Sequence, residues 1–177
     1  MKNFKWTAAA LAFFLTLALS VGLISLRQKQ MVKEPLLKRL NELQSVQAVN
    51  IQQEDGKYVI VVKLKNVKDF PSAYRKLQQE IENFLPEDKY HLDLLDQRNQ
   101  LLANAYQAVQ IALYEGEQRG NFTEMAQYIA RTLSEYKITE HHFTVDEENI
   151  YLKLQHDDAY LYATIKRQRW QKEGERT

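Results

Sequence analysis

The chain of 177 residues contains no cysteine and very few glycines. The lack of cysteine excludes disulfides, thiolate nucleophiles, cysteine-ligated metals and a lipid-modified cysteine behind a signal peptide. Its only glycines are Gly22, Gly56, Gly116, Gly120 and Gly174. Their spacing allows neither a phosphate-binding loop nor a dinucleotide-binding fingerprint. We therefore expect side-chain packing to stabilise the fold, and we expect no cofactor.

Charged residues are absent from one long segment, Trp6 to Leu26, with the sequence WTAAALAFFLTLALSVGLISL. As a helix this segment is long enough to cross the roughly 30 Å hydrocarbon core of a bilayer. The basic leader MKNFK suits either a membrane anchor or a signal peptide, and the small residues ending at Ser20 would suit cleavage. Because apolar residues continue past Ser20, the sequence predicts an uncleaved transmembrane signal anchor over residues 1–27. A juxtamembrane spacer, residues 28–34, follows it.

The charges around this segment favour two different orientations. Several basic residues between Arg27 and Arg39 follow the segment, and the positive-inside rule would keep that side in the cytoplasm. A short basic leader before one apolar segment is instead typical of a signal anchor whose C-terminal side is exported. We predict a single-pass protein of the cell membrane, bound to the lipid bilayer through Trp6–Leu26, with an extracytoplasmic soluble domain.

Beyond the anchor, the body of the chain is acidic and its ends are basic. Acidic residues outnumber basic ones between residues 40 and 165, whereas basic residues dominate residues 27–39 and the C-terminal end. An acidic body argues against a nucleic-acid partner. We read residues 168–177 as a basic, solubilising tail, and its return to the membrane surface through Trp170 is the alternative.

Apolar periodicity predicts a first lobe, residues 35–96, in the order helix, strand, strand, helix, strand (αββαβ). Pro35 suits the first turn of a helix, and Asp55 with Gly56 indicates a tight hairpin turn. The strand KYVIVVKLK directs alternate apolar residues inward, yet Val59 and Val61 on its other face are also apolar. These two valines form either a contact surface or a second buried face.

A second lobe, residues 97–167, is predicted in the order helix, helix, strand, strand, strand (ααβββ). Gly120 suits the position after the first of these helices, and Asn121 with Glu124 reads as a capping box. The three strands form a meander with turns at DEEN and QHDD. A four-residue second turn would pair Leu154 with Ala159. The alternative, a helix over residues 158–168, is weaker because tyrosine, threonine and isoleucine favour strands.

One face of this meander collects aromatic and polar side chains of a composition that interfaces favour. We predict a candidate interaction surface consisting of Tyr151, Lys153, Tyr160 and Tyr162, with Val59 and Val61. The alternative for both groups is burial under helices.

Both lobes contain a helix followed by a hairpin with an acidic turn, Glu54–Asp55 in one and Asp146–Glu147 in the other. The repetition fits either duplication or convergence. Neither lobe has enough apolar strand to be stable alone, so we expect a shared sheet or core. The predicted fold class is α+β: an N-terminal transmembrane helix, then two helix–hairpin (αββ) lobes with antiparallel sheet and about four helices.

No residue pattern indicates catalysis or metal binding. His141 and His142 are adjacent on a predicted strand and point to opposite faces. The acidic pairs Glu147–Glu148 and Asp157–Asp158 lack the spacing of a calcium loop. The serines carry no nucleophile motif. We predict that the protein is not an enzyme and has no catalytic, cofactor-binding or metal-binding residues.

Three segments carry a resemblance: PLLKRLNELQSVQAVNI, GKYVIVVKL and YEGEQRGNFTEM. Behind one N-terminal span, they resemble small membrane-anchored proteins of endospore-forming and related Gram-positive bacteria, which have no assigned function. The αββαβ order of residues 35–95 is also similar to ring-building modules of secretion-system and sporulation-channel proteins, which assemble laterally into membrane rings. These resemblances imply a noncatalytic interaction or assembly module of the bacterial cell envelope, with a protein partner or a second copy of the chain. The alternative is an anchored or secreted domain that binds a small ligand.

Overall fold

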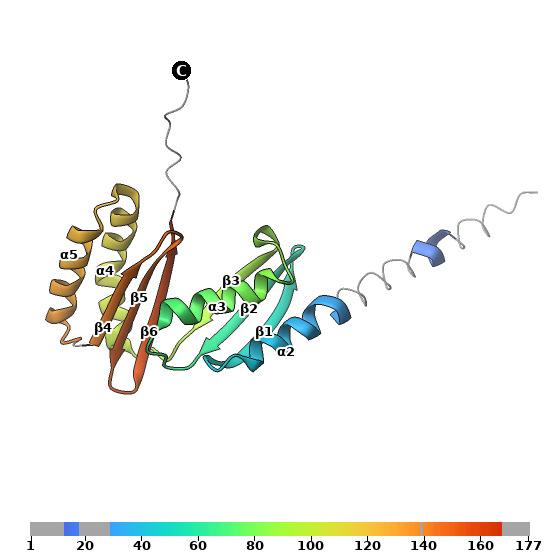
Figure 1. The fold of residues 1–177 in the computed structure, drawn as a ribbon, viewed down its shortest axis with the longest axis horizontal. Helices are drawn as coiled ribbons and strands as arrows, with labels where there is room; N and C mark the ends of the chain where they lie inside the picture. The colour runs from blue at the N-terminus through green and yellow to red at the C-terminus, as the bar shows by residue number, and fades with distance from the viewer. Residues whose placement is uncertain (1–12, 18–28, 139, 168–177) are drawn as a thin grey trace, which may run out of the picture.

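The computed structural model describes residues 13–17, 29–138 and 140–167 of the chain. Within these ranges the protein is α+β, with two three-stranded sheets that lie in separate lobes side by side (Figure 1). Most of the predicted anchor and the whole tail 168–177 fall outside the described residues. In the described part of the chain, no helix has both the length and the apolar character needed to cross a membrane.

The first lobe follows the predicted order of helices and strands. It consists of α2 (Glu34–Glu42), β1 (Val46–Glu54), β2 (Lys57–Leu64), α3 (Phe70–Glu82) and β3 (Tyr90–Leu95). A π-helical turn, Lys29–Lys33, precedes α2, and a 3-10 turn, Glu87–Lys89, precedes β3.

The first sheet has the order β1-β2-β3 and mixes two kinds of pairing. β1 and β2 are antiparallel and meet at a tight turn, in which Asp55 and Gly56 have φ values of 48° and 78°. β2 and β3 are parallel, which corrects the expectation of an antiparallel sheet. Parallel pairing follows because α3 carries the chain back to the end of the sheet at which β2 began.

A single apolar core joins α2, α3 and one face of the first sheet. Leu40 on α2, Leu77 on α3 and Ile60 on β2 are all fully buried in it. Asp69 begins α3 by accepting a hydrogen bond from the Ser72 N–H at 3.0 Å, as its position before the apolar stripe predicts.

The second lobe places two helices on one face of an antiparallel meander. It consists of α4 (Gln100–Arg119), α5 (Phe122–Glu135), β4 (Glu140–Val145), β5 (Asn149–His156) and β6 (Ala159–Lys166), with the sheet order β4-β5-β6. Leu154 pairs with Leu161, because the turn between β5 and β6 is tighter than the predicted four-residue loop. The register prediction is therefore wrong by two positions. Such a shift leaves every side chain on its predicted face, because strands alternate with a period of two.

The junction of α4 and α5 is only partly as predicted. Gly120 ends α4 in the left-handed conformation at φ 68°. Asn121 starts α5, but its side chain caps no backbone N–H. Its Nδ2 instead donates to Glu124 Oε2 at 2.9 Å, so the predicted reciprocal capping box is not formed.

Gly116 permits the close approach of α4 to α5. A Cβ atom on Gly116 would lie 2.2 Å from Sδ of Met125 and 3.0 Å from its Cβ and Cγ. We expect Gly116→Ala to lower the free energy of unfolding by about 1–3 kcal/mol, because displacing Met125 outweighs the higher helix propensity of alanine. Urea denaturation measures this loss. In a Met125→Ala background, Gly116→Ala should lower the free energy of unfolding by less. An equal loss in both backgrounds would contradict the proposed clash.

Candidate functional site

The predicted surface on the second sheet is not available to a partner. Tyr151, Lys153, Tyr160 and Tyr162 are only 1%, 3%, 4% and 3% exposed, respectively. The three tyrosines belong to the core of the first lobe, although their strands belong to the second. The predicted interaction surface is therefore wrong for these four residues, because α3 and the connection that leads into it cover this face of the sheet. The alternative reading of the sequence, burial under a helix, is the one that the structure has.

An aromatic cluster joins the two lobes. The rings of Phe70, the first residue of α3, and Tyr162 are stacked with centroids 4.4 Å apart. The Tyr151 ring packs edge to face with the rings of Phe70 and Tyr74, and its centroid lies 5.7 Å from each of theirs. Such pairs contribute about 0.5–1.5 kcal/mol each beyond the burial of their area. The cluster therefore fixes α3 against the second sheet.

The tyrosine hydroxyls satisfy backbone groups in the connection between β2 and α3. Tyr160 donates to the Leu64 carbonyl at 2.7 Å, and Tyr162 donates to the Lys65 carbonyl at 2.9 Å. The Tyr162 hydroxyl also accepts from the Val67 N–H at 2.7 Å. Burial raises the pKa of Tyr162 to about 12, against the opposing effect of the bond from Val67. These bonds make the connection part of the contact between the lobes.

Lys153 is buried beside this cluster, where it pairs with Tyr162 across β5 and β6. Its side chain is 3% exposed, and its Nζ lies 4.0 Å from Oε1 of Glu140. Burial lowers the pKa of Lys153, and the nearby Glu140 carboxylate partly opposes that effect. The sequence predicted that Lys153 belongs to an interaction surface, because it could not show what covers the strand.

Asp96 is the polar group at which the two sheets meet. Its side chain is 3% exposed, and Oδ2 accepts from the Tyr162 N–H at 2.9 Å and from Nη2 of Arg98 at 2.7 Å. The next residue, Gln97, forms an isolated antiparallel bridge with Tyr160. Sequence reasoning missed Asp96, since an acidic residue just after a strand usually faces solvent.

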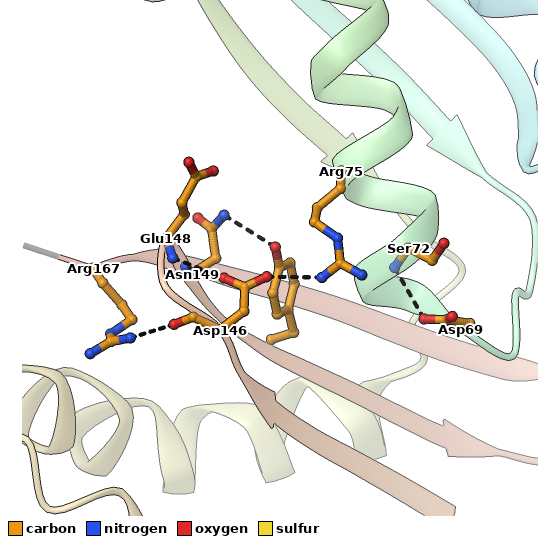
Figure 2. A network of polar contacts seen from close by, with 8 residues as sticks. Asp69, Ser72, Arg75, Asp146, Glu148, Asn149 and Arg167 are labelled. Atoms are coloured by element: carbon orange, nitrogen blue, oxygen red, sulfur yellow. Dashed lines mark hydrogen bonds and ion pairs between the residues drawn. The ribbon is translucent and has the colours of Figure 1, made fainter.

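A second polar contact is centred on Asp146 in the turn between β4 and β5 (Figure 2). Its Oδ2 accepts from Nη1 of Arg75 on α3 at 2.9 Å. Burial alone would raise the pKa of Asp146. Hydrogen bonds from the N–H groups of Asn149 and Glu148 and from Arg75 outweigh it and lower the pKa. The acidic turn singled out in the sequence thus positions α3.

A cleft of about 950 Å³ lies beside these contacts. It is bounded by α3, the start of β3, the turn between β4 and β5, and the end of β6. Its lining includes Tyr74, Glu82, Tyr90, Glu148, Thr164 and Lys166. This volume is within the range of small-molecule sites. No sequence pattern indicated the cleft, because its walls come from segments far apart in the chain.

The other predicted surface residues, Val59 and Val61, lie on the face of the first sheet opposite α2 and α3. We call this the open face. Both valines are half-buried, and neither belongs to one of the two apolar cores of the described residues. Lys63, two positions farther along β2, pairs with Leu95 of β3, whose side chain is 50% exposed. The predicted burial of the valines under a helix is therefore not found in the described part of the chain.

The two histidines considered for metal binding do not point toward a common site. His141 and His142 occupy consecutive positions of β4, so they point to opposite faces of the sheet. Across the described ranges, no group of three or more histidine, aspartate or glutamate side chains is placed to hold a metal ion.

Comparison with known proteins adds no family to these observations. No family model matches the chain. A search of curated proteins also gave no match. Both resemblances drawn from the sequence therefore stay predictions.

Proposed function

We propose that this protein is a membrane-anchored, noncatalytic assembly module of the cell envelope. In this proposal Trp6–Leu26 holds the chain in the bilayer and the two lobes project outside the cytoplasm. The open face then binds a protein partner or a second copy of the chain. The resemblance of the αββαβ lobe to ring-building modules supports assembly as an analogy of topology.

The observation that carries the proposal is the apolar strip across the open face. Val59 and Val61 on β2 provide partly exposed apolar area, and Leu95, two positions farther along β3 than the partner of Val61, adds to it. Polar side chains flank both valines. Val59 lies between Gln52 on β1 and His91 on β3, and Val61 lies between Asn50 on β1 and Asp93 on β3. An apolar centre with a polar rim is the usual composition of a protein interface.

Charge introduced at this strip should weaken association. We expect the double substitution Val59→Glu and Val61→Glu to weaken self-association, or partner capture, at least about tenfold, because association would bury the new carboxylates. The full chain is recovered from the membrane fraction in detergent. Sedimentation velocity then measures its oligomeric state, and affinity capture measures partner binding.

Ile111→Glu is the matched control, because it places a carboxylate on another exposed apolar side chain, 77% exposed on α4. Circular dichroism verifies that both variants are folded. A full chain that stays monomeric at high concentration and captures no protein would refute the proposal, as would equal association of the valine variant and the control.

A second candidate function, binding of a small ligand, is favoured by the cleft between the lobes. The cleft combines apolar and polar lining residues, which is the usual composition of a ligand site. Its walls belong to both lobes, and the aromatic cluster holds them in place.

A further inference from the structure

A groove of about 500 Å³ lies between α4 and α5 at the surface of the second lobe. Apolar side chains of both helices line it, namely Ala108, Ile111, Ala112, Met125 and Tyr128. Ile111 is 77% exposed and Tyr128 is 41% exposed, and neither belongs to one of the two apolar cores of the described residues. Adjacent exposed apolar side chains that line one groove are typical of a surface that binds a further segment.

The last described residue lies close to one end of this groove. β6 ends at Lys166, and the guanidinium of the next residue, Arg167, lies 4.9 Å from the centroid of the Phe122 ring. Phe122 is the first residue of α5, and Asn121 just before it lines the groove. The end of β6 and the junction of α4 with α5 accordingly lie at the same end of the second lobe (Figure 1). The residues that follow Arg167 therefore start beside the groove.

The sequence of these following residues suits an apolar groove. Residues 168–177 read QRWQKEGERT, in which Arg169 and Lys172 flank Trp170. Trp170 is three residues beyond Arg167, and three extended residues span about 10 Å, or roughly two turns of a helix. Since the groove begins next to Phe122, the indole ring can reach its walls. A tryptophan that packs in this way buries about 150–250 Å².

The charge at the edge of the groove is complementary to that of the tail. Glu115 is already paired with Arg119 at 2.8 Å. Glu124 instead accepts a hydrogen bond at 2.9 Å from Nδ2 of Asn121, which carries no charge. With the Trp170 ring in the groove, the basic residues on either side of it come near the Glu124 carboxylate, which attracts them.

We infer that the tail, residues 168–177, binds this groove of its own molecule, with the Trp170 ring between Ile111 and Tyr128. Attachment at Arg167 favours the chain's own tail over that of a second copy, because a tethered segment has a high effective concentration at a nearby site. The contact goes beyond the proposed assembly function, because it involves the second lobe and not the open face. It also keeps Trp170 away from the membrane surface.

Tryptophan fluorescence of the full chain in detergent tests this inference. The chain contains two tryptophans, so Trp6→Phe leaves Trp170 as the single emitter. We expect this protein to emit at shorter wavelength than the peptide 168–177 in buffer, and acrylamide to quench it less, because the groove excludes water from the ring. Dilution should change neither reading. Emission equal to that of the peptide would overturn the inference, and a bound signal lost on dilution would assign the tail to a second copy.

A variant of the groove distinguishes it from the detergent surface, which could also shift the emission of Trp170. In the Trp6→Phe background, Ile111→Ser should lower the ratio of bound to free tail at least about fivefold, measured by acrylamide quenching, because one apolar wall is lost. The matched control is Tyr114→Ser, since Tyr114 is 51% exposed on the same helix and does not line the groove.

Glu124→Gln is a second variant, which should also release the tail in part, and added salt should reduce its effect. Circular dichroism verifies that all variants are folded. If Ile111→Ser and Tyr114→Ser gave the same emission and quenching as the unsubstituted background, Trp170 would lie at the detergent surface and the inference would be overturned.

Discussion

Replacing Phe70 with alanine should lower the free energy of unfolding by about 3–5 kcal/mol. The ring is 1% exposed and contacts Tyr74, Tyr151 and Tyr162, so its removal leaves a cavity where the lobes meet. The lost aromatic pairs add to the cost of the cavity. Urea denaturation followed by far-ultraviolet circular dichroism measures the change. Near-ultraviolet dichroism should also weaken, because the surrounding tyrosines lose their fixed packing.

Phe84→Ala is the matched control for this prediction. Phe84 is a partly buried phenylalanine that packs on the core of the first lobe. It follows the end of α3 and is not part of the aromatic cluster that joins the lobes, so its removal should cost less. Should both substitutions cost the same, the cluster would have no special role in holding the lobes together.

Raising the pH from 10 to about 12 should strongly destabilise the protein. Tyr162 is 3% exposed, and burial raises its pKa from 10.0 in the unfolded chain to about 12 in the folded protein. The folded pKa is the higher one, so this stabilising contribution is complete below pH 10 and is lost as the pH rises to about 12. Tyr162 alone contributes about 2 kcal/mol to this loss. Tyr74, whose pKa is also raised to about 12, acts in the same direction.

Tyr162→Phe separates the hydrogen bonds of this hydroxyl from its titration. At neutral pH we expect a loss of about 1–3 kcal/mol, because the Lys65 carbonyl and the Val67 N–H lose their partner. Between pH 10 and 12 the variant should lose stability less steeply than the unmodified protein. Urea titrations at a series of pH values measure both effects.

Tyr128→Phe serves as the control, because this ring is 41% exposed on α5. The control should match the unmodified protein at neutral pH and at high pH. An unchanged alkaline slope in Tyr162→Phe would show that Tyr162 does not carry the predicted pH dependence.

The two candidate functions depend differently on the contact between the lobes. The open face consists of strands of the first lobe, whereas the walls of the cleft come from both lobes. Loosening the aromatic cluster with Phe70→Ala would therefore change the shape of the cleft directly. The same substitution would affect the open face only by making the first lobe less stable.

Local patterns in the sequence predicted the helices and strands well. Pro35, Asp69 and Gly120 mark helix ends, and Asp55 with Gly56 marks the first hairpin, because each acts through its own backbone or the next few residues. The alternation along β2 likewise predicted that Ile60 and Val62 are buried. The helices, the strands and the α+β class follow from such short-range effects.

Contacts between segments that are distant in the sequence decided which faces of these elements are buried. Alternation assigns Tyr151, Tyr160 and Tyr162 to one face of the second sheet, but it does not say whether solvent or another element meets that face. Phe70 and its helix cover it, although they lie far earlier in the chain. The parallel pairing of β3, the burial of Asp96 and the cleft have the same origin. The sequence by itself determined the helices, the strands and their faces, since these depend on neighbouring residues. Only the tertiary structure decided which faces are buried and where a cleft is left, since both depend on how the two lobes pack.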